Sequence, residues 1–280
     1  MLHSRLSDFK KKKNFLICID SDGTAMDVMN IKHKKCFGPC FVKEWQLEDF
    51  EGEALKLWNN INLYERTRGN NRFLTLYMAL CEVDKRFKKI DGLPELKKWL
   101  DNTKSLSNQS LINAIEDGGG EILRKTLNWS QSVNVSTALL TYDDKKPFDG
   151  VRECLINAVK QVDVAIVSSA GYAIIEEEWR YHDLIRFVNV LATQEDGTKK
   201  VCLEQLAQKG YDKDKILMIG DALSDMDAAK QAGTLFYPMI IDGESQSWQE
   251  LKDKYLQQFV EGKYKDSQPA LETQFENYFN

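Results

Sequence analysis

Two carboxylates stand directly after an apolar run near the start of the chain. The run, Phe15 to Ile19, has the length and the β-rich composition of a central parallel strand that is buried on both faces. In an open α/β sheet, ligands bind beyond the carboxyl ends of the strands, so Asp20 and Asp22 are predicted to lie in a crevice. Two ionised carboxylates this close repel each other, so we expect a divalent cation or an unequal sharing of protons there.

The next two residues are suited to a tight loop. Gly23 tolerates a positive φ where the chain leaves the strand, and Thr24 offers a hydroxyl to the same loop. Asp and Gly are also common in ordinary turns. The motif alone is therefore only moderately specific, and the rest of the chain has to decide.

Polar residues also occur at three later points of the chain, twice directly after a predicted strand and once at the start of a predicted helix. A predicted strand, Val162–Val167, ends at Ser168 and Ser169, and a predicted strand, Lys215–Ile219, runs into Asp221 and Asp225. Between them, a loop brings Lys199 and Lys200 to the start of a helix. One such site could arise from ordinary turn residues, but four in order along alternating strands and helices are not explained in this way. Parallel strands place their carboxyl ends at one edge of a sheet, so we expect these polar residues to meet there.

The spacing of apolar residues divides the chain into two kinds of structure. After Thr24 the strand-like runs give way to helical periodicity, as in Ala54, Leu57, Trp58 and Ile61, which indicates an all-helical insert. From Phe148 onward strands and helices alternate, which is typical of a parallel α/β sheet. We therefore predict a Rossmann-like parallel sheet with helices on both faces, and a helical insertion after its first strand. A short strand is expected at Arg186–Leu191 and a helix near Trp248–Phe259.

The composition restricts the classes of function. With 42% hydrophobic and 29% charged residues in 280, the chain is typical of globular proteins, and its net charge of −5 argues against nucleic acid as the main partner. The stretch Met1–Lys10 has no apolar core of a signal peptide, and no run reaches the roughly 18 apolar residues of a membrane span. We expect a cytoplasmic protein without a membrane partner.

The cysteines and a run of lysines are interpreted as structural features rather than as functional sites. Six cysteines without a Cys-x-x-Cys pair favour buried, reduced thiols, and the spacing of Cys36 and Cys40 makes a metal pair an unfavourable alternative. Lys10–Lys13 is interpreted as a solvated segment beside the first strand rather than a nucleic-acid patch.

Taken together, these motifs resemble those of the haloacid dehalogenase superfamily of phosphohydrolases. Asp20-Ser-Asp22-Gly-Thr24 resembles the first motif of that superfamily, and the strand that ends at Ser168 resembles the second. Lys199-Lys200-Val-Cys-Leu203 resembles the third, and Gly220-Asp221-x-x-x-Asp225 resembles the fourth. The likeness covers residues 12–24 and 148–240. It implies an α/β core at 1–24 and 148–241, a helical type 1 cap at 25–147, and a C-terminal helical extension at 242–280 with no readable role.

The resemblance implies a Mg²⁺-dependent phosphatase that acts on a small phosphorylated metabolite. Asp20 would be the nucleophile that forms an aspartyl-phosphate, and Asp22 the general acid and base. An aspartate at this second position favours a phosphatase over a dehalogenase or phosphonatase. Mg²⁺ would be held by Asp20, the backbone carbonyl of Asp22, and Asp221, with Asp225 acting through water or by orienting Lys199. The expected phosphate-binding residues are Gly23, Thr24, Ser168, Ser169 and Lys199.

Two assignments within the motifs have alternatives. Lys199 is preferred to Lys200 as the phosphate-binding lysine, because Leu203 follows it at the spacing of the third motif. Ser169 is otherwise interpreted as a helix N-cap or a loop hydroxyl. In the insert, substrate contacts are expected from Lys32, His33 and Lys34, and from Arg68 and Arg72, whose guanidinium groups suit a carboxylate or a second phosphate. Solvated or structural roles are the alternative for each of them.

Other functions remain open at this level. A phosphotransferase or sugar-phosphate mutase on the same core would share the first chemical step. A non-catalytic binding module would be expected to lack a motif residue, and none is missing here. The sequence does not identify the substrate or the oligomeric state.

Overall fold

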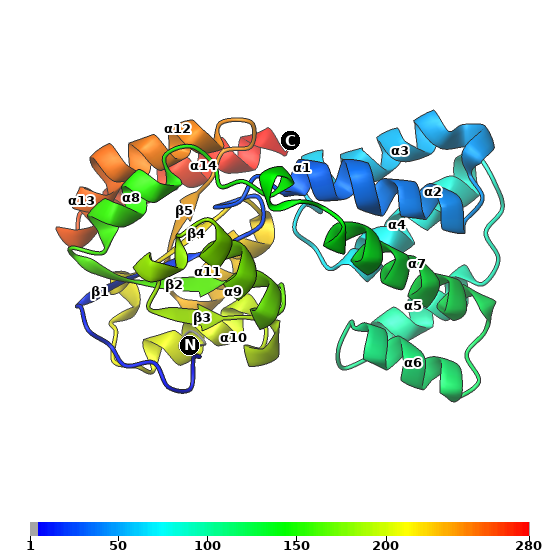
Figure 1. Cartoon of the computed structure of the whole chain (residues 1–280), viewed down its shortest axis with the longest axis horizontal. Coiled ribbons are helices and arrows are strands. Elements are labelled where there is room, and N and C mark those ends of the chain that lie inside the picture. Colours follow the sequence, from blue (N-terminus) through cyan, green and yellow to red (C-terminus); the bar gives the residue numbers. More distant parts are fainter. Residues whose placement is uncertain (1–4, 280) are drawn as a thin grey trace. The chain divides into compact units, whose positions relative to one another are not determined.

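The computed structural model describes residues 5–279, so the first four residues of the N-terminal stretch Met1–Lys10 lie outside it. The chain divides into two compact units. One contains the chain up to Val28 together with the chain from Tyr142 onward, and the other is Met29–Thr141 (Figure 1). These bounds lie four to six residues from the expected ones at 24/25 and 147/148. The reason is pairing between the two connecting segments, in which Asp27 N–H donates to Lys146 O at 2.8 Å and Phe148 N–H donates to Ala25 O at 3.0 Å.

The first unit is built on a five-stranded sheet in the order β3-β2-β1-β4-β5. All neighbouring strands are parallel, and Ile19 of β1 pairs with Ile166 of β2 on one side and with Ile219 of β4 on the other. The carboxyl ends of the three central strands therefore lie at one edge. The strands are β1 (Phe15–Ile19), β2 (Val162–Val167), β3 (Val190–Ala192), β4 (Ile216–Gly220) and β5 (Leu235–Pro238).

The helices of this unit cover the sheet and confirm the predicted α/β fold. Residues from α10, α11 and α14 pack with those of β1, β2 and β4 in one apolar cluster that contains Leu203, Met226 and Phe275. Other helices, α8 and α12, contact each other, and α8 also contacts β2. The helices are α8 (Val151–Ala158), α9 (Tyr172–Tyr181), α10 (Lys199–Ala207), α11 (Leu223–Ala232), α12 (Glu244–Glu250), α13 (Leu256–Val260) and α14 (Gln268–Tyr278).

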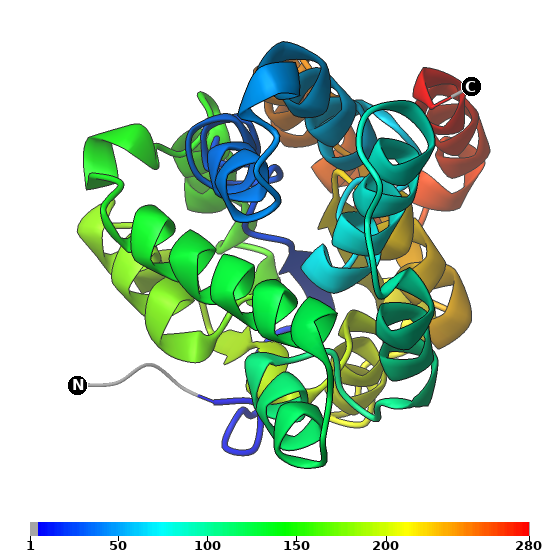
Figure 2. The same cartoon turned by 90° about the vertical axis from the view of Figure 1, so that its right-hand side faces the viewer.

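The second unit consists of helices joined by loops (Figures 1 and 2), as its apolar periodicity predicts. Its core is rich in aromatic side chains, among them Phe41, Trp58 and Trp129, which are fully buried. The helices are α1 (Met29–Lys32), α2 (Gly38–Glu44), α3 (Glu51–Asn59), α4 (Arg72–Arg86), α5 (Leu93–Asn102), α6 (Asn108–Glu116) and α7 (Glu121–Ala138), with single π-helical turns at His33–Phe37 and Asn60–Tyr64.

Two predicted elements differ in the structure. The segment predicted as a strand at Arg186–Leu191 begins instead with a 3₁₀ turn, Ile185–Phe187, and the strand β3 starts only at Val190. The helix predicted near Trp248–Phe259 is formed by α12 and α13 with a π-helical turn, Leu251–Tyr255, between them. All six cysteines are free. Within residues 5–279, we find no helix with the length and apolar character needed to cross a membrane.

Candidate active site

The loop after β1 is held in a tight turn by its own backbone. Asp20 N–H continues the sheet by donating to Ile219 O of β4 at 3.0 Å. The carbonyl of Ser21 accepts from both Ala25 N–H at 3.0 Å and Met26 N–H at 2.8 Å, which folds the loop back on itself. Gly23 has a φ of 81°, a conformation that a side chain would strain. The glycine therefore permits the tight turn that carries Asp20 and Asp22, as its tolerance of a positive φ predicted.

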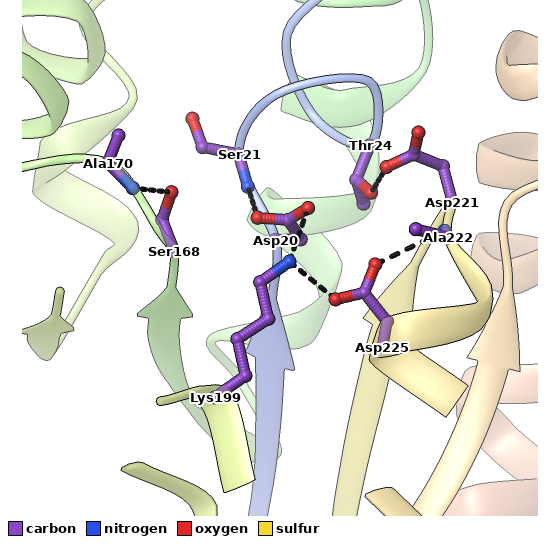
Figure 3. Close-up of polar contacts among 9 residues, drawn as sticks. All are labelled: Asp20, Ser21, Thr24, Ser168, Ala170, Lys199, Asp221, Ala222 and Asp225. Atoms are coloured by element: carbon purple, nitrogen blue, oxygen red, sulfur yellow. Dashed lines mark hydrogen bonds and ion pairs between the residues drawn. The ribbon is translucent and has the colours of Figure 1, made fainter. Parts of the chain in front are cut away.

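Three buried carboxylates meet at this edge. Asp20 follows β1, Asp221 follows β4, and Asp225 lies in the first turn of α11. One oxygen from each lies within 4.8 Å of the others (Figure 3). Gly220 makes this approach possible, because a Cβ at this position would lie 2.4 Å from Asp225 Cβ. Backbone N–H groups support the cluster as well, since Ser21 N–H donates to Asp20 Oδ1 at 2.8 Å and Ala222 N–H donates to Asp225 Oδ2 at 3.2 Å.

Lys199 lies against the cluster. Its Nζ is 2.8 Å from Asp20 Oδ2 and also bonds Asp225 Oδ1 (Figure 3). Lys199 lies in the first turn of α10, and Thr198 caps this helix by accepting from Val201 N–H. Lys200 lies on another face of the helix, where its Nζ is 3.9 Å from half-buried Glu204. The structure thus brings Lys199, and not Lys200, to the carboxylates.

Burial and charge shift the pKa values in the cluster. Burial raises the pKa of Asp20 well above its usual range, Lys199 opposes this shift, and the carboxylates of Asp225 and Asp221 add to it. The pKa of Asp225 is raised for similar reasons. Burial lowers the pKa of Lys199, but Asp20 and Asp225 outweigh burial, and the net shift is upward. Lys199 is therefore charged at neutral pH.

The donor set of this cluster fits a hard divalent cation. With its three carboxylates ionised, as a bound cation would require, the cluster together with the Lys199 ammonium would carry a formal charge of −2, which a divalent cation would compensate. Mg²⁺ prefers oxygen ligands and usually binds through one or two carboxylates and several waters. The Asp20, Asp221 and Asp225 oxygens satisfy this preference in composition and proximity.

Thr24 has a contact different from the one expected. Its hydroxyl is buried and donates to Asp221 Oδ1 at 2.7 Å (Figure 3). A hydroxyl has one proton to donate, so this proton is directed at a carboxylate rather than at a phosphoryl oxygen. The side chain of Thr24 thus contacts Asp221, and phosphate binding by Thr24 stays a prediction.

The two serines after β2 differ in their surroundings. Ser168 is buried, and its N–H donates to Ala192 O at 3.0 Å. Its Oγ accepts from Ala170 N–H at 3.2 Å (Figure 3). An Oγ that accepts this bond can still donate its own proton. Ser169 is exposed in the loop, and the N-cap of α9 is Gly171, so the N-cap interpretation of Ser169 is wrong and the loop interpretation holds.

The expected substrate contacts of the helical unit converge around one histidine. Buried His33 accepts at Nδ1 from Trp58 Nε1–H at 3.2 Å and stacks on Phe37 with the ring centroids 4.7 Å apart. Arg72 places its guanidinium 5.0 Å from the centroid of the same Phe37 ring. Burial, followed by the charges of Arg68, Lys32 and Arg72, lowers the pKa of His33 to about 3. His33 is therefore neutral at physiological pH and lies within reach of three cations.

The two arginines are fixed by neighbours in this unit. Arg68 is buried and donates from Nη1 to Leu63 O at 3.0 Å. Arg72 donates from Nη1 to Asn134 Oδ1 at 2.8 Å. Lys34, in contrast, is exposed on the turn that follows His33. The structure gathers Lys32, His33, Arg68 and Arg72, and it separates Lys34 from their buried surroundings.

Sequence reasoning did not anticipate two tryptophans that hold the loop after β1. Trp179 Nε1–H donates to Ser21 Oγ at 3.0 Å, and Trp248 Nε1–H donates to Thr24 O at 2.8 Å. Both side chains are fully buried. A buried indole N–H needs a hydrogen-bond acceptor, so a buried tryptophan indicates that such a partner exists. The acceptors lie 158 and 224 residues away, so the sequence does not reveal them.

Comparisons with known proteins agree with this architecture. Residues 86–237 match the family described as haloacid dehalogenase-like hydrolase. A search among curated protein sequences gave no match. The matched range contains β2, α10 and β4, whereas Asp20 on the loop after β1 lies outside it.

Solved structures of low sequence identity share the fold. A candidate haloacid dehalogenase-like hydrolase from Bacteroides fragilis has 15% identity and a TM-score of 0.53, over 84% of this chain and 93% of that one. A candidate phosphoglycolate phosphatase from Lactobacillus delbrueckii subsp. bulgaricus has 13% identity and a TM-score of 0.53, over 89% and 92%. A haloacid dehalogenase-like family hydrolase from Streptococcus pneumoniae has 12% identity and a TM-score of 0.50, over 84% and 90%.

The fold and the site define an α/β protein with a carboxylate cluster at the carboxyl edge of a parallel sheet and a helical insertion after its first strand. The family match extends over more than half of the chain. The chain belongs to the haloacid dehalogenase-like hydrolases.

Proposed function

We propose that this protein is a Mg²⁺-dependent phosphatase that hydrolyses a small phosphorylated metabolite through an aspartyl-phosphate on Asp20. One observation carries the proposal. Asp20 lies in a buried cluster with Asp221 and Asp225, and its carboxylate is 2.8 Å from the ammonium of Lys199. A carboxylate that is fixed in this way beside a cation is arranged to approach an anionic phosphoryl group.

The first half of the reaction transfers the phosphoryl group to the protein. A carboxylate oxygen of Asp20 attacks phosphorus, and the bond between phosphorus and the leaving oxygen breaks. Asp22 gives its proton to the leaving alcohol. In the second half a water attacks phosphorus, Asp22 takes a proton from it, and the bond to Asp20 breaks to release phosphate. Asp22 is only half-buried, which suits a group that exchanges protons with substrate and water.

Two side chains are suited to hold the transferred phosphoryl group. Lys199 has three N–H donors, and Asp20 and Asp225 accept two of them, so the third can bind a phosphoryl oxygen. Ser168 can donate its hydroxyl proton while its Oγ accepts from Ala170 N–H. Exposed Ser169 is proposed as a further contact, whereas Gly23, whose N–H donates to Met26 O at 2.9 Å, is proposed to shape the loop around the phosphoryl group. These donors stabilise the charge that develops on the phosphoryl oxygens.

The metal centre is assigned to the carboxylate cluster and to one backbone carbonyl of the loop after β1. Asp20, Asp221 and the backbone carbonyl of Asp22 would hold Mg²⁺, and Asp225 would act through a water or by orienting Lys199, which it bonds. When bound, Mg²⁺ neutralises charge between the carboxylates and the phosphate ester.

The helical unit is proposed to act as the cap that selects the substrate. Lys32, Arg68 and Arg72 converge around neutral His33, and this arrangement supports binding of a carboxylate or a second phosphate on the substrate. Arg72 is held by Asn134 and packs on Phe37, so its guanidinium is already ordered for such a contact.

A panel of phosphate esters tests the proposal. Phosphate release is measured for matched esters with and without a second anionic group, in Mg²⁺ and then in excess chelator, for the wild-type protein and Asp20→Asn. We expect release that needs Mg²⁺, is lost in Asp20→Asn, and favours the esters with a second anionic group. Release that persists in the chelator or in Asp20→Asn would contradict the mechanism, and an equal rate for both ester classes would contradict the role of the helical unit.

A further inference from the structure

The C-terminal segment, residues 242–279, is attached to the sheet through β5. Tyr264 donates its hydroxyl proton to Phe236 O at 2.7 Å, and Tyr237 of β5 donates to Ser247 O at 2.7 Å. Tyr237 also packs against Tyr255 and Tyr264, with ring centroids 5.5 and 6.2 Å apart. The segment is therefore part of the folded α/β unit, although its sequence carries no motif of the family.

One side chain of this segment reaches the loop that carries Asp20 and Asp22. Trp248 of α12 is fully buried and donates from Nε1 to the carbonyl of Thr24 at 2.8 Å. Gly150 makes room for it, because a Cβ at this position, where φ is 91°, would lie 3.2 Å from Trp248 Cβ. The preceding residue, Ser247, is anchored to β5 by Tyr237. The indole is thus fixed from two sides.

Thr24 connects this indole to the carboxylate cluster. Its carbonyl accepts from Trp248, and its hydroxyl donates to Asp221 Oδ1 at 2.7 Å. Threonine is β-branched, and few side-chain rotamers are open to it for a given backbone. A bond that fixes the orientation of the Thr24 backbone therefore also restricts the direction of its hydroxyl, and hence the conformation of Asp221.

We propose that Trp248 is a positioning residue of the metal centre. Through Thr24 it holds Asp221 in the conformation that binds Mg²⁺, and this gives the C-terminal segment a role in the function of the α/β unit. The inference rests on the metal centre in the proposed function. Residues that orient metal ligands typically change metal affinity by 10–100-fold when they are replaced, so the effect should be measurable in binding as well as in turnover.

Calorimetric titration of the full-length protein with MgCl₂ tests this role without any substrate. Trp248→Phe keeps an aromatic ring in the site and removes the N–H donor, and Thr24→Val keeps the branched shape and removes the hydroxyl. We expect each variant to bind Mg²⁺ at least ~10-fold more weakly than the wild type. The double variant should bind no more weakly than the weaker single variant, because both changes break the same path.

Tyr264→Phe is the matched control. It removes an equally buried hydrogen bond between the same C-terminal segment and the sheet, but this bond does not lead to Thr24. We expect it to lower thermal stability and leave the Mg²⁺ dissociation constant unchanged. Spectra of the ¹⁵N-labelled indole groups add a readout that needs no Trp248 variant: Mg²⁺ should shift a tryptophan indole signal in the wild-type protein, and Thr24→Val should remove that shift.

The outcomes are distinguishable. Wild-type affinity in Trp248→Phe, additive losses in the double variant, or an equal loss in Tyr264→Phe would each overturn the positioning role. Indole signals that do not respond to Mg²⁺ would overturn it as well. A wild-type protein that binds no Mg²⁺ would overturn the metal centre itself, which is a different result from a wild type that binds and a Trp248→Phe variant that binds equally well.

Discussion

The buried histidine of the helical unit should make this unit sensitive to acid. The pKa of His33 is lowered to about 3, by burial first and then by the nearby cations Arg68, Lys32 and Arg72. In the unfolded chain a histidine has a pKa of about 6.5. The unfolded state therefore takes up a proton first as the pH falls, so the contribution of neutral His33 is complete above about pH 6.5 and is lost between about pH 6.5 and 3.

The size of this loss follows from the two pKa values. One pKa unit corresponds to about 1.4 kcal/mol, and pH 5.0 lies about 1.5 units below the unfolded value. Between pH 7.5 and 5.0, His33 should lower the free energy of unfolding by about 2 kcal/mol. In His33→Gln, whose side-chain oxygen can accept the bond from Trp58, this part of the pH dependence should disappear.

Urea denaturation at the two pH values, followed by tryptophan fluorescence, measures this difference. Four of the six tryptophans, Trp45, Trp58, Trp99 and Trp129, lie in the helical unit, so the signal reports mainly its unfolding. Carboxylates and His182 titrate in both proteins, and their effects cancel in the comparison. An equal change of stability with pH in the wild type and in His33→Gln would refute the buried, neutral state of His33.

Two further predictions concern the carboxylate cluster. Lys199→Met should lower kcat by about 10²- to 10³-fold, because a charged donor to the transferred group is lost. Lys200→Met should stay near the wild type, since Lys200 pairs with Glu204 on another face of the helix. Steady-state kinetics of the two variants measures this difference, and an equal loss of kcat in both would contradict the assignment of Lys199. Gly220→Ala should destabilise the protein by about 1–3 kcal/mol, since the new Cβ would lie 2.4 Å from Asp225 Cβ. Thermal denaturation measures this cost, and an unchanged midpoint would refute the close approach.

The strands β1, β2 and β4 could be predicted because they are mainly apolar runs that end in polar residues, although β2 contains Asp163. Lys199 was preferred to Lys200 because Leu203 follows it at the spacing of the third motif, which is what the resemblance implies. Helix geometry agrees with that choice, since a residue and the one four positions later lie on the same face of a helix. Leu203 is fully buried in the core, so Lys199, four residues earlier, lies on the inward face, whereas Lys200 shares its face with Glu204. Local sequence pattern was sufficient for the strands, and the motif spacing was sufficient for the lysine.

Elements with mixed local signals were not predictable in the same way. The segment Arg186–Leu191 contains apolar residues suited to a strand, yet its first part forms a 3₁₀ turn after Leu184, and within this segment only Val190 and Leu191 pair with β2. The helices in residues 29–44 carry several lysines together with Gly38 and Pro39, which obscure their periodicity. The conformation of such segments is decided by tertiary packing rather than by local propensity.

The contacts that complete the site depend on distant parts of the chain. Thr24 could be recognised as a loop hydroxyl, but its partner Asp221 is 197 residues away, and Trp248 is 224 residues away. Similarly, no spacing rule indicates that His33 and Arg72 meet through Phe37. The types of the site residues were readable from sequence, whereas the support around them follows only from the fold.

The most direct test of the account is the detection of phosphate on Asp20. The protein is mixed with Mg²⁺ and the ester that it hydrolyses fastest, quenched in acid during turnover, and digested for peptide mass spectrometry. The account predicts a phosphorylated peptide with the modification on Asp20, and none in Asp20→Asn. Rapid turnover with phosphate on another residue, or on none under conditions where release from the protein limits the rate, would contradict nucleophilic attack by Asp20.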